Sequence, residues 1–222
     1  MKADLCYGFS STDWVKLFPK LDNDENAWLQ AIDVFERRMK ERFFSCLDAL
    51  VQADTKPDLQ SDALGTDHCI PGFSVMALCC LLIETLQGFR EPSTPFSPPG
   101  PCEFPAGLCI KPSSGTNEQF RKFLRLPSFG GAFNNKDVAN EFLRGVRNGI
   151  LHEGETRKWV IWRQEPQEQI VAPEQDGYAL NRYLFYGAVK QEFESYLKDL
   201  RNPESKQRQR FREQMQKLCN ET

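Results

Sequence analysis

The alternation of apolar and polar residues predicts a chain built mainly from helices. From Asn26 to Ala53 the apolar residues recur at steps of three and four, the spacing that places them on one side of an amphipathic helix. Residues 71–91 predict a second helix, which is apolar on almost every side from Val75 to Ile83 and therefore suits the centre of a core. Helical spacing returns at residues 181–201.

Between these helices the pattern predicts breaks and one β element. Residues 92–115 contain seven prolines, so neither a helix nor a central strand continues through them. This Pro-rich segment is a substrate or partner surface, or a tolerated insertion. A short helix is expected at 117–126, followed by a helix that begins near Asn135 or Asp137 as its cap. The stretches KWVIWRQEP and QEQIVAP predict a small hairpin that covers this last helix.

These elements predict an all-α helical bundle with a small β-hairpin. We expect a single domain over residues 1–202, with the Pro-rich segment as an insertion. Residues 203–222 are expected to form a polar tail helix with Phe211, Met215 and Leu218 on one side. The basic residues of this tail can touch RNA, form a solvated face or dock onto a partner.

Composition narrows the functional classes only slightly. The 222 residues carry a net charge of -3 and are 40% hydrophobic, which excludes a wholly disordered chain and gives no overall case for binding DNA or an anionic membrane. The N-terminus lacks the apolar run of a secretory signal, and residues 75–83 are too short for a membrane span. We therefore expect a cytoplasmic protein without membrane contact.

The eight cysteines show no paired Cys-x-x-Cys spacing, so we interpret them as reduced thiols. A zinc site from Cys102 and Cys109 with His68 and Cys69 is conceivable, but its spacing is unlike that of known zinc sites. Outside that arrangement, His68 is interpreted as a surface or loop residue. We expect no metal and no cofactor.

The candidate chemistry lies in VRNGILHEGET, residues 146–156. At roughly 100° per residue, one side of this helix carries apolar residues that should face the core, namely Val138, Phe142, Val146 and Ile150. The opposite side carries four polar residues able to handle phosphate, namely Arg144, Arg147, Asn148 and His152. Leu151 lies among them, which suggests that a second subunit covers this face.

Ordinary helix chemistry explains part of the same stretch. A histidine in the last helical turn is favoured by the helix dipole, and Gly154 suits the left-handed residue that ends a helix. Arg and Asn on a solvent-facing side need no function.

The motif RNGILH nevertheless resembles the HEPN superfamily, whose signature is Arg, four to six residues and then His, often with Asn directly after the Arg. Arg147, Asn148 and His152 fit that signature. The surrounding FLRGVRNGILHEGETR and the upstream GFSVMALCCLLIETLQGFRE are similar to bacterial HEPN proteins found near defence and toxin loci. The resemblance extends over about residues 26–200 and does not include the Pro-rich segment or the tail.

The resemblance implies a metal-independent endoribonuclease in which the 2′-hydroxyl of RNA attacks its own phosphate. His152 is the candidate acid or base because imidazole titrates near neutral pH, and Arg147 would stabilise the charge on the phosphate. Asn148 would orient either group, and Arg144 would extend the phosphate contact. Glu84 is either an anchor for Arg147 or His152 or an ordinary carboxylate at a helix end.

The family also implies a homodimer, or a pair with another HEPN chain, in which two motifs meet in one cleft. The expected role is that of a toxin or abortive-infection effector, held inactive by a regulatory protein or antitoxin. Two alternatives remain: a non-catalytic HEPN module that binds nucleotide or protein, and an adaptor subunit of a larger defence complex. Walker and dinucleotide glycine loops and a His-Glu-x-x-His metal site are missing from the sequence.

Overall fold

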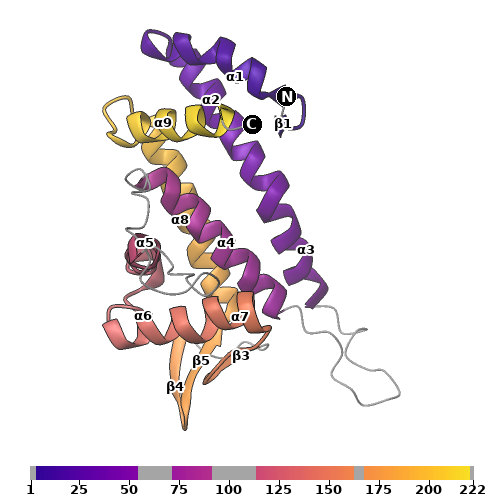
Figure 1. The fold of residues 1–222 in the computed structure, drawn as a ribbon, viewed down its shortest axis with the longest axis vertical. Helices are drawn as coiled ribbons and strands as arrows, with labels where there is room; N and C mark the ends of the chain where they lie inside the picture. The colour runs from indigo at the N-terminus through magenta and orange to yellow at the C-terminus, as the bar shows by residue number, and fades with distance from the viewer. Residues whose placement is uncertain (1–3, 55–71, 92–113, 163–167, 221–222) are drawn as a thin grey trace, which may run out of the picture.

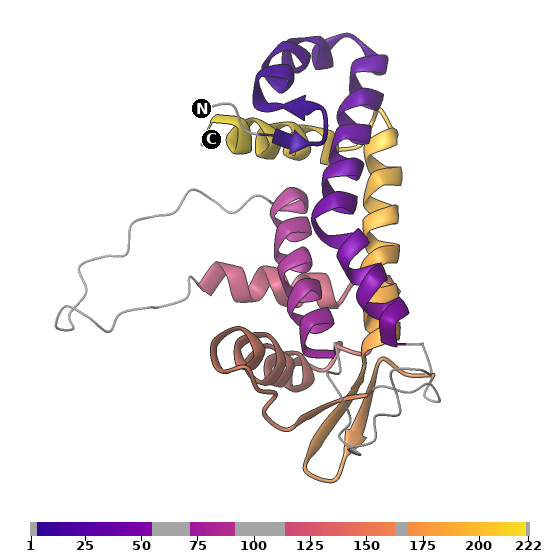
Figure 2. The same cartoon turned by 90° about the vertical axis from the view of Figure 1, so that its right-hand side faces the viewer.

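A computed structural model describes residues 4–54, 72–91, 114–162 and 168–220, and it is mostly helical. Three long helical segments run along the molecule: α2–η2–α3, α4 and α8 (Figure 1). The α6–η5–α7 helix lies across the end of this bundle, beside a small sheet (Figures 1 and 2). The prediction of a predominantly α-helical fold is confirmed. The possible zinc ligands and most of the Pro-rich segment lie outside the described residues.

The helix predicted at 26–53 is continuous but changes its winding once. Its parts are α2 (Glu25–Met39), a π turn η2 (Lys40–Phe44) and α3 (Ser45–Asp54). Asp24 caps its start, where the side chain accepts a hydrogen bond from the N–H of Asn26 at 2.9 Å. The π turn widens the helix by about one residue, so the side chains that follow it are rotated relative to a regular helix.

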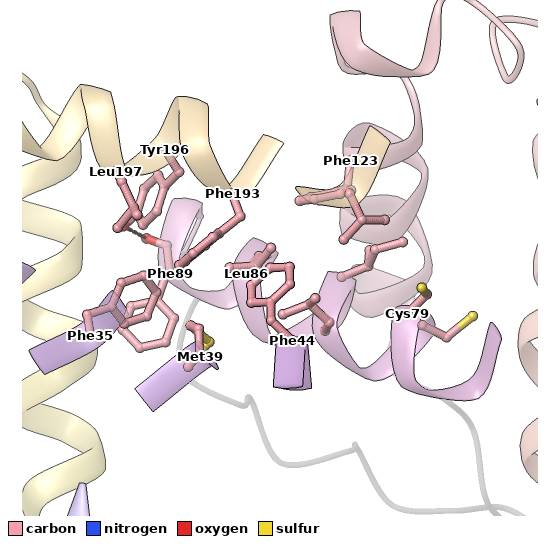
Figure 3. Packing of buried hydrophobic residues seen from close by; sticks show 14 of the residues in the cluster. Phe35, Met39, Phe44, Cys79, Leu86, Phe89, Phe123, Phe193, Tyr196 and Leu197 are labelled. Atoms are coloured by element: carbon pink, nitrogen blue, oxygen red, sulfur yellow. Dashed lines mark hydrogen bonds between the residues drawn. The ribbon is translucent and has the colours of Figure 1, made fainter. Parts of the chain in front are cut away.

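The core surrounds α4 (Gly72–Arg90), which packs against α3, α5, α8 and α9. The ring centroids of Phe35 in α2 and Phe89 in α4 are 4.6 Å apart. Phe193 and Tyr196 of α8 also contact the ring of Phe35 (Figure 3). Such tilted and edge-to-face pairs stabilise a core beyond their buried area. The apolar sequence of α4 therefore marks the centre of the bundle, as predicted.

Among the described helices, α4 alone is long and apolar enough to cross a membrane. Of the residues in the most apolar stretch of α4, 56% are buried inside the protein. A membrane-spanning helix and a buried core helix share the same apolar composition. The burial of α4 inside the protein is typical of a core helix.

The second half of the chain adds shorter helices and a further aromatic cluster. These elements are α5 (Ser114–Leu124), a 3₁₀ turn η4 (Pro127–Phe129), α6 (Lys136–Phe142), a π turn η5 (Leu143–Arg147) and α7 (Asn148–Glu153). Asn135 caps α6 by accepting from the N–H of Asp137 at 2.8 Å. Phe142 stacks on Phe185 of α8, with 5.3 Å between centroids. This contact fixes the motif helix against the bundle.

The sheet differs from the predicted hairpin. Its strands are β3 (Trp159–Trp162), β4 (Val171–Glu174) and β5 (Gly177–Asn181), in the order β3-β5-β4. The two predicted strands do not pair with each other, because β5 lies between them, parallel to β3 and antiparallel to β4. The prediction overlooked the turn of Gln175 and Asp176 before Gly177, a short hairpin signal that joins β4 to β5.

The C-terminal helices return along the bundle. Asn181 caps α8 (Arg182–Arg201), and α9 (Gln207–Asn220) then packs across α1, α4 and α8. Phe211 and Met215 of α9 are fully buried, so the polar tail helix shares the main core. The N-terminal segment beside it comprises β1 (Asp4–Cys6), β2 (Phe9–Ser10), α1 (Ser11–Leu17) and a 3₁₀ turn η1 (Phe18–Asp22).

Two ion pairs attach α9 to the N-terminal half. Arg208 donates to the carboxylate of Glu25, with Nη1 to Oε2 at 2.8 Å, and its guanidinium lies 4.8 Å from the centroid of Trp28. Arg212 pairs in the same way with Asp22, with Nη2 to Oδ2 at 3.2 Å. The hydrogen bond from Arg208 holds the pKa of Glu25 below its ordinary value of 4.5, and Arg212 lowers the pKa of Asp22 below 3.8.

Acid is therefore expected to weaken the attachment of α9. Because both carboxyls have a lower pKa in the folded state than in the unfolded state, their contribution to stability is present at neutral pH and is lost as the pH falls through the folded-state values. Urea unfolding between neutral pH and about pH 3 should show a smaller loss of unfolding free energy in the double variant Glu25→Gln, Asp22→Asn than in the wild type. Equal losses in both proteins would show that the pairs contribute nothing.

Candidate functional site

The motif lies on one continuous helix whose winding changes in the middle. The N–H of Asn148 donates to the carbonyl of Leu143, which is the five-residue step of a π turn. A glycine pair, Gly145 and Gly149, lets the chain fold back onto this helix. A Cβ at Gly145 would lie 2.6 Å from the carbonyl oxygen of Arg157, and one at Gly149 would lie 2.4 Å from that of Glu155. The helix and the segment after it therefore form one tight unit.

Backbone hydrogen bonds hold that return segment in place. The N–H of Arg157 donates to the carbonyl of Gly145 at 3.2 Å, and the N–H of Glu155 donates to that of Gly149 at 3.3 Å. Gly154 is left-handed, with φ of 69°, which confirms its predicted role in ending the helix. Trp159 follows and packs on Phe142, with 5.5 Å between centroids. The start of the sheet thus braces the motif helix from behind.

Arg147 is fixed by two polar partners. Its Nε donates to Oε1 of Glu84 in α4 at 2.8 Å, and its Nη2 donates to the same oxygen. Its Nη1 donates to Oδ1 of Asn148 at 2.7 Å. The side chain of Arg147 is 15% exposed and that of Glu84 is 28% exposed. Of the two interpretations of Glu84, the geometry favours an anchor for Arg147.

The environment beneath this pair is apolar. Cys80, one helical turn before Glu84, is fully buried. Burial raises the pKa of its thiol far above its usual range, and the carboxylate of Glu84 raises it further. The Cys80 thiol is therefore protonated at neutral pH, and the polar groups of the site are confined to the solvent side of α4 and α7.

His152 and Asn148 lie on the same face of α7, because they are four residues apart in an α-helix. The side chain of His152 is exposed and has no hydrogen bond to any residue that the structure describes. Its imidazole is thus open to a ligand, while Asn148 links the same face to Arg147. The structure brings Arg147, Asn148 and Glu84 into direct contact and leaves His152 accessible one helical turn after Asn148.

Arg144 lies apart from this hydrogen-bonded group. Its side chain is 66% exposed, and its contact with Glu141 is long, at 3.9 Å between Nη1 and Oε1. The regular helical wheel placed Arg144 and Arg147 together on a side away from the core. The burial of Arg147 differs from that picture, since both residues lie inside the π turn η5, where successive residues are separated by a smaller angle than in a regular α-helix. Arg144 remains a candidate for an outer phosphate contact.

The core side of the motif helix agrees with the predicted pattern. Phe142 and Val146 are fully buried, and Val138 and Ile150 pack partly against the core. Sequence reasoning did not single out Gly145 and Gly149 as parts of the site. Two glycines four residues apart inside an amphipathic helix were the available signal, because glycine interrupts a helix unless close backbone contact requires it.

Two exposed apolar side chains remain near the motif. Leu151 of α7 is 36% exposed and Leu81 of α4 is 42% exposed. Isolated exposed leucines are common on protein surfaces, but here they lie on the two helices that carry Glu84, Arg147 and His152. They are candidates for a contact surface around the site.

Comparisons with known proteins add no functional assignment. No protein family, no curated protein and no solved structure matches this chain. Among the described residues, no three His, Cys, Asp or Glu side chains gather as a metal site would require.

Proposed function

We propose that this protein is a metal-independent endoribonuclease of the HEPN type. The observation that carries the proposal is the set of contacts that fixes Arg147 against Glu84 and Asn148, on the helix that presents an exposed His152. The two partners satisfy donors of a guanidinium that is only 15% exposed, and they hold it in one orientation. In this proposal Arg147 binds the phosphate and His152, five residues further along the same helix, transfers the proton.

The proposed reaction moves two protons, one from the attacking oxygen and one to the leaving oxygen. The neutral imidazole of His152 accepts the proton of a ribose 2′-hydroxyl, whose oxygen forms a bond to the adjacent phosphorus. The bond from phosphorus to the 5′-oxygen breaks, and an imidazolium supplies the proton that this oxygen takes up. The products are a 2′,3′-cyclic phosphate and a free 5′-hydroxyl.

Arg147 stabilises the charge that builds up on the phosphate. A guanidinium has five N–H donors, and Glu84 and Asn148 occupy three of them. Two donors are left for phosphate oxygens in a fixed orientation. The Glu84 carboxylate also places the guanidinium before substrate arrives, which reduces the reorganisation that the reaction requires.

The proposal includes a homodimer, or a pair with another HEPN chain, because one histidine does not serve easily as base and acid in the same step. Two motifs facing each other would supply a second imidazole. In the cell we propose an RNA-directed toxin or abortive-infection effector that acts in the cytoplasm, with a regulatory protein or antitoxin that holds it inactive.

The dimer is tested by charging its proposed contact. Leu151→Asp places a carboxylate on an exposed position of α7, so folding should change little while association across the motif face is lost. Sedimentation should show a dimer for the wild type and a monomer for the variant, with RNA cleavage lost in parallel. Val160→Asp is the matched control, since Val160 is also exposed, at 52%, but lies on β3. A monomeric wild type that cleaves RNA would contradict this part of the proposal.

The activity itself is tested on total RNA with a metal chelator present throughout. Purified protein should cleave RNA and leave 2′,3′-cyclic phosphate ends, which a cyclic phosphodiesterase converts to linear phosphates. Binding of RNA or nucleotide without cleavage would support the alternative of a non-catalytic HEPN module. Activity or stability only after co-expression with a second protein would support an adaptor subunit.

A further inference from the structure

A hollow of about 290 Å³ lies next to the proposed catalytic group, between the end of α2, η2, α4 and α9. Arg38, Arg42 and Phe43 form one wall, and Gln214 of α9 forms another. Thr85 and Gly88 of α4 form the floor, and a Cβ added at Gly88 would meet nothing within 4 Å. Glu84 belongs to the same lining, so the hollow begins at the residue that anchors Arg147.

The charge of this hollow is positive. Arg38 donates to the carbonyl of Leu5 at 2.9 Å and Arg42 donates to that of Asp4 at 3.2 Å. Neither has a carboxylate partner among the described residues, and Glu84, the one carboxylate of the described lining, is engaged by Arg147. Burial and the neighbouring charge of Arg42 lower the pKa of the Arg38 guanidinium. Within the residues that the structure describes, the two guanidinium groups therefore lack a counter-charge, which an anion would supply.

Neighbouring cations on the same helix are neutralised. Arg37 pairs with Asp33 at 3.0 Å, and Lys40 pairs with Glu36 at 2.7 Å. Both pairs are of the ordinary exposed type, four residues apart along a helix. Of the cations from Arg37 to Arg42, the two without a carboxylate partner in the described part of the chain are thus those that line the hollow, which separates this place from the general surface of the helix.

We infer that the hollow formed by Arg38, Arg42, Phe43, Thr85, Gly88 and Gln214 binds the phosphodiester backbone of a single RNA strand, at a phosphate other than the one cleaved. The inference rests on the proposed function and names how its substrate is held. Guanidinium groups match phosphate oxygens in pairs, and the half-buried ring of Phe43 offers a face on which a base can stack. The strand passes over α4 from Arg147 to Arg42.

The test measures RNA binding in the His152→Ala background, so that cleavage does not interfere. A fluorescent oligouridine of about 12 nucleotides is titrated at several salt concentrations. The double variant Arg38→Gln, Arg42→Gln should bind about 10-fold more weakly, and the slope of log affinity against log salt should fall by about 0.7 for each phosphate contact that is lost. An affinity and slope equal to those of the background protein would overturn the inference.

The matched control is Arg37→Gln. Arg37 lies on the same helix and also contacts the N-terminal segment, where its Nη1 donates to the carbonyl oxygen of Tyr7 at 3.4 Å. It does not line the hollow. Its substitution should leave RNA affinity and salt dependence unchanged. If Arg37→Gln weakens binding as much as the double variant does, the effect arises from the N-terminal segment, and the inference fails.

Gln214 provides variants that leave both arginines in place. Gln214→Glu keeps the size of the side chain and adds a negative charge to the hollow, so it should weaken RNA binding. Gln214→Lys should strengthen binding, a gain that misfolding does not produce. Binding that is insensitive to both changes would also overturn the inference.

Three further outcomes separate this inference from the proposed function. If the wild type cleaves RNA and the Arg38, Arg42 variant cleaves a dinucleotide normally but has a raised KM for the longer RNA, both proposals stand. If no RNA is cleaved while the hollow still governs RNA affinity, the catalytic proposal fails and the binding site stands. If the wild type and the Arg38, Arg42 variant have equal KM values for the longer RNA, the RNA-binding role of the hollow is rejected and the catalytic proposal stands.

Discussion

The variant His152→Ala is expected to lose RNA cleavage by about 10²- to 10⁴-fold, the range associated with removing a positioned general acid or base. The imidazole is exposed and contacts no described side chain through a hydrogen bond, so its loss should cost little stability. Cleavage rates on a fluorogenic RNA and a thermal unfolding curve measure the two effects separately. A large loss of activity with an almost unchanged Tm identifies a chemical role.

Two further variants make this result specific. His152→Gln retains hydrogen-bonding groups but does not titrate, so it should be as inactive as the alanine variant. Glu153→Gln changes the next exposed residue of α7, whose carboxylate pairs with Arg157, and it should retain wild-type activity. If His152→Gln cleaves RNA normally, His152 transfers no proton and the mechanism is wrong.

The variant Arg147→Lys is expected to reduce cleavage by about 10²- to 10³-fold, comparable with removing one donor that stabilises a developing negative charge. Lysine retains the positive charge but not the planar fork that binds Glu84 and Asn148 at once. The unfolding free energy should also fall by about 1–3 kcal/mol, because half-buried polar groups lose their partners. Single-turnover rates and urea unfolding measure both quantities.

Glu84→Gln shows whether Glu84 acts through Arg147. The amide still accepts a hydrogen bond but has no charge, so we expect a smaller loss of cleavage activity, about 10-fold. The double variant Glu84→Gln, Arg147→Lys should be no less active than Arg147→Lys alone. Additive losses would mean that Glu84 and Arg147 act independently. Lys136→Gln is the control for a positive charge on the same helix, because Lys136 is exposed at the start of α6.

The positions of the main helices could be predicted from the sequence because each depends on local periodicity. The recurrence of apolar residues gave the helix over 26–53, the central helix at 71–91 and the helix at 181–201, which correspond to α2–η2–α3, α4 and α8. Local chemistry likewise placed Asn135 as a cap and Gly154 as a left-handed end. The core face of the motif helix followed from the same reasoning.

The pairing of strands could not be predicted with the same success. Alternation indicated that Trp159 and Val171 lie in strands, but it does not say which strands are neighbours. The parallel pairing of β3 with β5 joins Trp159 to Tyr178, residues well separated in sequence. Such pairing is decided by packing on the motif helix, where Trp159 contacts Phe142, rather than by local preference.

The sequence by itself determined that this chain is predominantly helical and that Arg147, Asn148 and His152 fall at the end of an amphipathic helix. Those features depend on residues within a few turns of each other. Only the tertiary structure decided that Glu84 reaches Arg147, 63 residues away, and that Arg38 and Arg42 meet Gln214 around one hollow. The physical reason is that both contacts join helices far apart in the sequence, so they depend on how those helices pack. The π turns that contain Arg42 and Arg147 also change where these side chains point.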